Sequence, residues 1–298
     1  MGGSGRVFNA MLRTAGIDRA EVLLTHVFDR QAPENKPEVW RTNAERRTEA
    51  FDRLASELER ARPNVVVPLG PTALWAFTGQ TALTPFRGNI VQASRIRPGQ
   101  KLVPTFHPRE VMAQWKFMPV VVQDFVRAFS ESRFPEIRPV EGHLLLEPNL
   151  DDVRTFLAEC RKARLLSVDI ETGWGLITSI GFAPNPTVAM SIPFVDLTRP
   201  DRSYWRTPET EREVWLEVKH LLEDPSIPKL GQNFTYDAFW LWKRAGIGVR
   251  GYVEDTRLKH HAIYPELPKD LAFMSSYTDL GAWKHMGGRY NAETKRDA

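Results

Sequence analysis

An apolar run that ends in two carboxylates constrains the fold of this 298-residue chain more than any other feature. Residues 165–171 read LLSVDIE, a short apolar stretch followed by acids, which predicts a buried strand with Asp169 and Glu171 at its end. Side chains at positions i and i+2 point to the same face of a strand, so we expect the two carboxylates to converge on one spot.

A second acidic element follows at residues 231–237, which read GQNFTYD. Asn233 and Asp237 are four positions apart, so we expect them to be neighbours on one face of a helix. Asp169, Glu171 and Asp237 would then form a cluster of carboxylates that repel one another unless a hard divalent cation lies among them. Such oxygen ligands suit Mg²⁺ or Mn²⁺, and two such ions drive in-line phosphodiester hydrolysis. The pattern therefore predicts a metal site of two ions held by these three carboxylates.

The two motifs resemble those of the proofreading 3′→5′ exonuclease domain attached to family A DNA polymerases, and of phage-type polymerases in particular. Such domains carry a DxE first motif on a strand and an NxxxD second motif on a helix. The resemblance continues through residues 254–256 (EDT) and 260–279 (HHAIYPELPKDLAFMSSYTD). It implies an RNase H-like fold, action on the 3′ ends of single-stranded DNA and a polymerase module C-terminal to this chain. The implied roles are catalysis by Asp169, Glu171 and Asp237, nucleotide orientation by Asn233 and support of the site by Asp255.

The third motif of that family departs from its pattern in this chain. The family places a fourth metal-binding Asp late in the domain, four residues after a Tyr that orients the attacking water. Here Tyr290 is followed at that spacing by Thr294, and Asp297 is the remaining candidate. Either this copy deviates or the third motif lies beyond Ala298, and we favour the second interpretation.

Length and linker composition predict two domains. A chain of 298 residues exceeds the usual size of a single domain. Residues 132–142 read SRFPEIRPVEG, whose prolines, charges and glycine are typical of a linker. We therefore expect one domain at residues 1–134 and a second at residues 141–298.

The first of these domains alternates helices and strands. Residues 21–28 and 64–70 are apolar runs that predict buried strands, and residues 7–16, 45–62 and 71–79 predict helices. Strands continuous in Val and Leu that alternate with helices favour a parallel sheet covered on both faces, an α/β/α layering. Ligands of such sheets bind at the carboxyl ends of the strands.

Several segments of this domain resemble the uracil-DNA glycosylase superfamily. They are residues 3–27, the strand and helix at 62–79, the FRG loop at 86–88 and the PTFHP stretch at 104–108. The resemblance implies that a base is flipped out of the DNA stack and cut from its sugar. It also implies that His107 stabilises the departing uracil anion and that His26 stands at the position that reads the base.

Three departures weaken a glycosylase reading. The chain begins after the place where the family's first motif would stand, so we expect this domain to be incomplete at its N-terminus. The base-reading position, usually an Asn after a Thr, holds His26 after Thr25, which offers a different pattern of donors and acceptors. Cys160 is the single cysteine, so the four ligands of an iron–sulfur cluster are lacking and we expect no such cluster. We favour a fold relic or a DNA-binding accessory over active excision.

Charge is divided unevenly between the two halves of the chain. Residues 1–134 carry 19 Lys and Arg against 13 Asp and Glu, whereas residues 135–298 carry 21 against 24. A basic first half suits a polyanionic partner, because phosphate contacts dominate affinity for nucleic acid. The amphipathic stretch at 45–63 is equally well explained as a solvated helix face. The isolated cations expected to contact substrate are Arg87, Arg95, Arg97, Lys101, Arg109 and Lys116.

The chain holds nine tryptophans, which can either stack on bases or fill a core. We expect core packing for Trp75, Trp240 and Trp242. Trp174 follows the DxE motif directly, in ETGWG, and we expect it to line the path of the substrate's 3′ end.

Composition indicates the compartment. A single cysteine fits a reducing cytoplasm. The sequence has no apolar stretch of about 18–20 residues that could cross a membrane, and its first residues, MGGSGR, lack the apolar segment of a secretory signal. We expect a soluble protein without membrane contact, in the cytoplasm of a bacterial host or a phage-infected cell.

The sequence thus predicts a metal-dependent 3′→5′ exodeoxyribonuclease that proofreads for a DNA polymerase. Two alternatives remain. One is a non-catalytic DNA-binding accessory region, and the other is a uracil-DNA glycosylase that acts in base excision.

Overall fold

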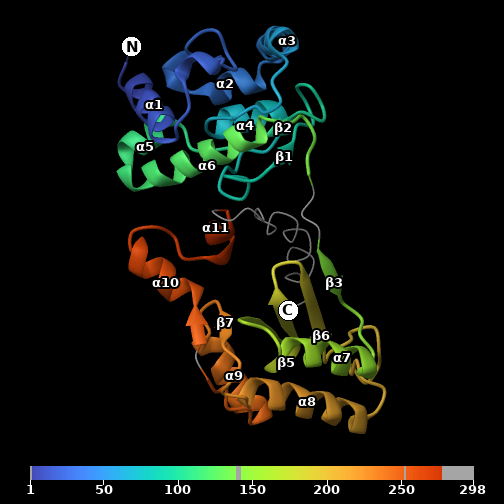
Figure 1. Ribbon diagram of the computed structural model, residues 1–298. Coiled ribbons are helices and arrows are strands. Elements are labelled where there is room, and N and C mark those ends of the chain that lie inside the picture. Colours follow the sequence, from blue (N-terminus) through green and yellow to red (C-terminus); the bar gives the residue numbers. More distant parts are fainter. Residues whose placement is uncertain (1, 139–141, 252, 277–298) are drawn as a thin grey trace. The chain divides into compact units, whose positions relative to one another are not determined.

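The chain divides into two compact units. The computed structural model describes residues 2–138, 142–251 and 253–276 (Figure 1). Unit 1 comprises Met1–Pro139 with Glu266–Ala298, and unit 2 comprises Val140–Pro265. The division lies inside the linker expected at residues 132–142. Residues 266–276, however, pack with unit 1 instead of with the rest of the expected second domain. Tyr290, Thr294 and Asp297, on which the third motif depends, lie outside the described residues.

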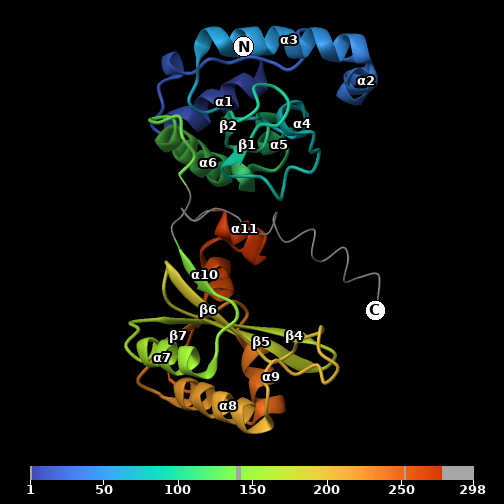
Figure 2. The ribbon, with the colours of Figure 1, turned by 90° about the vertical axis from the view of Figure 1, so that its right-hand side faces the viewer.

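Unit 2 is built on a mixed sheet of six strands in the order β3-β6-β5-β4-β7-β8 (Figure 2). Neighbours β4–β5 and β5–β6 run antiparallel, whereas β3–β6, β4–β7 and β7–β8 run parallel. This arrangement confirms the mixed-sheet α/β class predicted for the second domain. The strands are β3 (His143–Leu145), β4 (Leu166–Gly173), β5 (Leu176–Asn185), β6 (Val188–Pro193), β7 (Lys229–Gly231) and β8 (Val253–Asp255).

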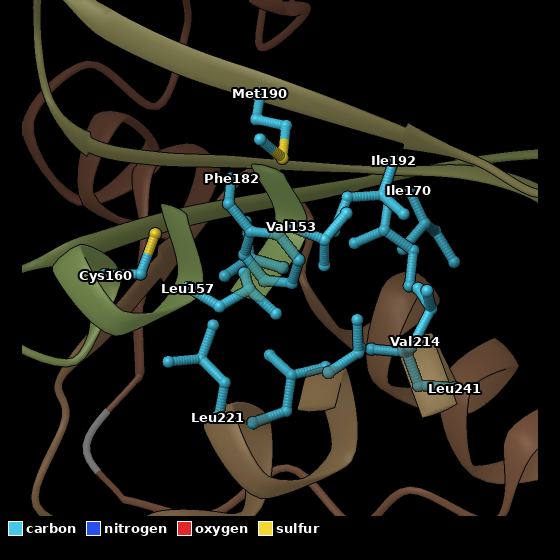
Figure 3. Close-up of a cluster of buried hydrophobic side chains, with 14 of the residues drawn as sticks. Val153, Leu157, Cys160, Ile170, Phe182, Met190, Ile192, Val214, Leu221 and Leu241 are labelled. Atoms are coloured by element: carbon cyan, nitrogen blue, oxygen red, sulfur yellow. The ribbon is translucent and has the colours of Figure 1, made fainter. Parts of the chain in front are cut away.

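The helices of unit 2 are α7 (Leu150–Cys160), α8 (Pro208–Glu223), α9 (Thr235–Ala245) and α10 (Thr256–Ile263). Helix α7 begins at a capping box, in which Asn149 and Asp152 satisfy each other's backbone N–H groups. Figure 3 shows side chains of α7, α8 and α9 meeting those of the sheet in one apolar cluster. Fully buried members include Leu157, Ile180 and Leu221, so this cluster is the core that holds the sheet and helices together.

Strand β4 presents its acids to one face of the sheet. Leu166, Val168 and Ile170 are buried, whereas Asp169 and Glu171 between them are exposed. This alternation is the two-residue period expected from the sequence. Pairing with β7 ends at Ser167, which leaves the rest of that edge of β4 open to other partners.

Unit 1 is mainly helical. Its helices are α1 (Gly3–Thr14), α2 (Pro37–Thr42), α3 (Ala44–Ala61), α4 (Pro71–Thr78), α5 (Pro108–Ala113), α6 (Met118–Glu131) and α11 (Leu271–Ser275), with 3₁₀ turns at Arg19–Glu21, Pro33–Asn35 and Trp115–Phe117. Strands β1 (Val91–Gln92) and β2 (Lys101–Leu102) pair antiparallel. Trp75 is buried with Leu54 and Leu102 in one of two apolar clusters that the described residues of this unit form, as the sequence predicts. None of the helices within the described residues of either unit is long and apolar enough to cross a membrane.

The expected parallel sheet of unit 1 is reduced to two bridges. Val66 pairs with Leu102 and Leu69 with Thr105, both in parallel. The segment at residues 64–70 therefore pairs along one of its edges, with residues 102–105. The expected strand at residues 21–28 belongs to no ladder of the described residues. Instead Arg53 of α3 donates hydrogen bonds to the carbonyl oxygens of His26 and Val27, which hold that segment against a helix.

Truncation of the unit 2 core should lower stability sharply. Ile180→Ala removes a fully buried side chain of β5 and should lower the free energy of unfolding of unit 2 by about 3 kcal/mol, measured by chemical denaturation. The matched control is Leu197→Ala, where the side chain is 58% exposed and the change should stay within about 0.5 kcal/mol. Equal losses in the two variants would contradict this assignment of the core.

Candidate functional site

Asp237 of α9 meets the open edge of β4. It is 4% exposed, and its Oδ1 accepts a hydrogen bond from the backbone N–H of Ile170 at 3.0 Å. Ile170 lies between Asp169 and Glu171 on the strand, so this bond brings the first and second acidic motifs together.

The electrostatics of Asp237 reflect this crowded position. Burial is the main reason that its pKa is raised to about 6, and the negative charges of Asp169 and Asp255 raise it further. The hydrogen bond from Ile170 acts in the opposite direction, because it stabilises the carboxylate form. Asp169 and Asp255 are therefore near enough to influence Asp237, and its ionised state is held at a cost in free energy.

Asp255 has the opposite environment. Burial alone would raise its pKa, but backbone N–H groups outweigh that effect and lower it. Its carboxylate accepts from Arg257 and Leu258 at the start of α10, at 2.8 and 3.3 Å. It also accepts from Asn233 and Phe234, at 3.1 and 2.8 Å, in the turn before α9. Asp255 therefore fixes the backbone that leads into α9 and, through it, the position of Asp237.

Asn233 lies outside the helix that the sequence predicts for it. Helix α9 begins at Thr235, and Asn233 has a left-handed backbone with φ of 58°. The expectation that Asn233 and Asp237 share a helix face is therefore wrong. The physical reason is the bond of its N–H to Asp255, together with the tolerance of Asn for this backbone region. Its side-chain Oδ1 accepts a hydrogen bond from Arg257 at 2.8 Å.

Trp174 occupies the tip of the β4–β5 hairpin. Gly173 pairs with Leu176, and both residues between them have positive φ, 50° at Trp174 and 75° at Gly175, as in a type I′ turn. A bulky side chain at such a backbone angle is strained, which points to a role for the residue itself. Its side chain is 66% exposed, and Thr172 of the same hairpin is hydrogen-bonded to the Tyr236 hydroxyl of α9 at 2.6 Å.

The donor set fits a divalent cation in its chemistry. Asp169, Glu171 and Asp237 supply only carboxylate oxygens, and a cation would relieve the repulsion that raises the Asp237 pKa. In the part of the chain that the structure describes, no group of three or more His, Cys, Asp or Glu side chains is arranged to hold a metal ion. Asp169 and Asp237 form the interacting pair, and Glu171 lies two residues along the same strand face.

In unit 1, Gly70 and His107 lie close together, because they follow closely after the parallel bridge between Leu69 and Thr105. A Cβ on Gly70 would lie 3.1 Å from the His107 Cβ, and Gly70 has φ of 84°, so only glycine fits there without strain. Although the His107 residue is exposed, partial desolvation is the main reason that its pKa is lowered, followed by the charges of Arg109 and His26. Its Nδ1 accepts from the Arg109 N–H at 3.1 Å, which leaves Nε2–H as the donor of the neutral ring.

His26 lies near His107 and lines an open pocket of about 540 Å³ with Arg53, Glu57 and Arg60 of α3. Thr25 donates to Glu57 at 2.5 Å within this pocket.

Arg87 is not a surface cation. Its side chain is 1% exposed and its Nη1 pairs with the equally buried Asp124 at 2.7 Å. Its guanidinium also bonds the Ser276 hydroxyl and lies 4.9 Å from the Phe273 ring centroid. The expectation that Arg87 contacts substrate is corrected on this ground, because a buried charge needs its partner.

Lys101, another cation expected to contact substrate, is also buried and paired, so this expectation is corrected on the same ground. Its side chain is fully buried, and its Nζ bonds Glu131 at 2.9 Å.

In unit 2, the expected core role of Trp242 is wrong, because that side chain is 67% exposed, whereas Trp240 is partly buried.

Comparisons with known proteins find similarities over part of the chain. Residues 1–130 match the model of the Uracil DNA glycosylase superfamily. Over 134 residues the chain is 28% identical to the type-4 uracil-DNA glycosylase of Thermotoga maritima, covering 44% of this chain and 66% of the glycosylase. Over 124 residues it is 28% identical to the DNA polymerase of Bacillus phage SP01, covering 41% of this chain and 13% of the polymerase. The chain therefore spans less than two thirds of either relative.

Among solved structures, the RNase D–GMP complex of Trypanosoma brucei is similar at 18% identity, with a TM-score of 0.39 over 52% of this chain and 47% of the other. A likeness of this size does not establish a shared activity.

The raised pKa of Asp237 predicts a pH dependence of stability. In the unfolded chain this carboxyl releases its proton near pH 4, whereas in the folded unit it does so at about 6. Between these values the folded state binds more protons, so the free energy of unfolding falls as pH rises and stays lowered above pH 6.

Asp237→Asn should remove this fall. In chelator at pH 7.5 it should raise the free energy of unfolding by about 1–3 kcal/mol, with little gain at pH 4.5. Urea denaturation at both values measures the effect, with Asp201→Asn at an exposed position as control. A variant no more stable than wild type at pH 7.5 would show that burial and neighbouring charges do not destabilise the ionised form of Asp237.

Proposed function

We propose that unit 2 is a metal-dependent 3′→5′ exonuclease that acts on single-stranded DNA. The observation that carries the proposal is the meeting of Asp237 with β4, which sets a buried carboxylate of raised pKa beside Asp169. A perturbed acid beside a second acid is a common mark of a functional site. The DxE motif of Asp169 and Glu171, which lies on strand β4, agrees with this proposal.

Each residue of the site has a separate task in this proposal. Asp169, Glu171 and Asp237 would hold the divalent cations, two Mg²⁺ or Mn²⁺ ions, which supply an activated water and stabilise the leaving 3′-oxygen. Asp255 is a positioning residue, because its contacts are to backbone N–H groups. Asn233 and Arg257 form a hydrogen-bonded pair next to the site that would orient the terminal nucleotide. Trp174 would line the path of the 3′ end.

A proofreading role is proposed because part of this chain is similar to a DNA polymerase. The match to a phage DNA polymerase supports a polymerase module as the partner of this chain. Such a partner would deliver single-stranded 3′ ends in the cytoplasm of a bacterial or phage-infected cell.

Removal of one carboxylate should abolish digestion. With wild-type protein and Mg²⁺, a 5′-labelled single-stranded oligonucleotide should shorten from its 3′ end, and chelator should stop the reaction. Asp169→Ala should be slower by at least about a hundredfold, the loss expected when a charge-stabilising group is removed. The control Asp201→Asn should digest like wild type. An intact oligonucleotide from folded wild-type protein would favour the non-catalytic DNA-binding alternative.

A second candidate function, uracil excision by unit 1, is favoured by one observation. Residues 1–130 match the superfamily model, and in the same region His107 presents a neutral Nε2–H beside Gly70 and His26. Such a donor could stabilise a departing base anion.

Excision is separable from digestion by its metal requirement. Wild-type protein in chelator should release uracil from a single-stranded oligonucleotide, seen as alkali-labile sites. His107→Ala should reduce release by about a hundredfold, and Asp169→Ala should leave it unchanged. If wild-type protein releases no uracil, or His107→Ala releases it at the wild-type rate, this second function is wrong.

A further inference from the structure

Helix α9 carries aromatic and basic side chains together on its exposed side. Tyr236 is 45% exposed and Phe239 50% exposed, and Trp240 lies between them with ring centroids 6.2 and 6.4 Å away. The Lys243 Nζ lies 5.2 Å from the Phe239 centroid and 5.4 Å from that of Trp240, and the Arg244 guanidinium lies 5.6 Å from Trp240. These five residues are called the α9 patch below.

The opposite side of the same helix packs against the core of unit 2, and the half-buried Trp240 of the patch shares in that packing. Leu241 is fully buried, and Ala238 and Ala245 pack against the core of unit 2. The spacing of three and four residues within the patch places its members on one side of the helix. Tyr236, Phe239, Lys243 and Arg244 are therefore exposed beyond the surface that packs against the core, and Trp240 lies at the margin of that surface.

We propose that the α9 patch binds single-stranded DNA on the 5′ side of the 3′ end held at the carboxylate site. The inference rests on the proposed function of that site and adds to it a separate surface for the strand. Each base can stack on an aromatic ring while Lys243 and Arg244 meet the phosphates.

The patch meets the β4–β5 hairpin, whose first strand carries Asp169 and Glu171, at two points. At its first end, Tyr236 precedes the buried Asp237 and bonds Thr172, a neighbour of Glu171 on β4. At its other end, Arg244 reaches the β4–β5 turn, where a Cβ on Gly175 would lie 3.1 Å from its Nη2. Trp174, exposed in that turn, extends the aromatic surface.

Charge favours a nucleic acid over a protein as the occupant. The single acid of α9 is Asp237, which is buried, so the exposed side of the helix is cationic. Lysine is depleted from the centre of protein interfaces, yet Lys243 contacts two of the three rings here. A polyanion that offers flat bases satisfies both kinds of side chain at once.

The length of the patch along α9 determines how many nucleotides it can contact. From Tyr236 to Arg244 the helix rises about 12 Å, which corresponds to roughly three or four stacked nucleotides at about 3.4 Å each. Oligonucleotides of two or three residues would occupy only the carboxylate site, and those of twelve would reach the whole patch.

Binding in chelator, where no cleavage occurs, tests the patch by itself. Fluorescence anisotropy with a thymidine 12-mer should show affinity weakened about tenfold or more in Phe239→Ala/Lys243→Ala, both exposed positions, with little change for a 3-mer. The loss of Lys243 should also reduce the slope of log affinity against log salt by about 0.7. The matched control, Leu216→Ala/Lys162→Ala, removes the same kinds of side chain from exposed positions elsewhere on unit 2 and should bind like wild type.

The outcomes separate this inference from the proposed function. If the patch variant binds and digests 12-mers like wild type while Asp169→Ala is inactive, the inference is wrong and the exonuclease stands. If wild type fails to digest but binds 12-mers through the patch, the inference stands and the exonuclease fails. If the patch variant binds DNA normally but loses self-association in sedimentation, the patch is a protein contact and the inference is overturned.

Discussion

The hydrogen bond between the Ile170 N–H and the Asp237 carboxylate is the contact on which the site of unit 2 depends. It uses the edge of β4 that β7 leaves unpaired, and it attaches α9 to the strand that carries Asp169 and Glu171. A hydrogen bond to a charged group contributes about 1.5–3 kcal/mol. Here it opposes burial and the repulsion of neighbouring acids, which raise the Asp237 pKa. The fold therefore holds the Asp237 carboxylate at a position where a bound cation would stabilise its ionised form.

Asp237 and Asp255 show how one residue type can serve two purposes. The Asp255 carboxylate accepts from backbone N–H groups of two segments, so its charge is satisfied by the protein and its pKa is lowered. Asp237 receives one such bond and faces other acids, so its pKa is raised to about 6. Environments that move two carboxyl groups in opposite directions distinguish a positioning role from a ligand role. The charge of Asp255 is thus satisfied within the fold, and we propose that Asp237 is the acid available to a cation.

The sequence predicts the parts of this arrangement that follow from local periodicity. The alternation of β4 and the apolar faces of the helices indicated both the sheet and the pairing of Asp169 with Glu171 on one face. Contacts between distant residues were beyond such reasoning. The left-handed turn at Asn233 depends on Asp255, and the burial of Arg87 depends on Asp124. The sequence predicted Trp242 to be a core residue, but the side chain is exposed. Apolar spacing alone does not distinguish a buried helix face from an exposed one.

The most direct test of the central claim, that these acids form a divalent-cation site, is Mn²⁺ binding followed by electron paramagnetic resonance. Free Mn²⁺ gives a sharp spectrum that is lost on binding, so titration measures both affinity and stoichiometry. Wild-type protein should bind Mn²⁺ at neutral pH, and binding should weaken below pH 6 as Asp237 takes up its proton. Asp169→Asn should lose this binding, and Asp201→Asn should keep it. Equal binding by all three proteins, or none by wild type, would contradict the account.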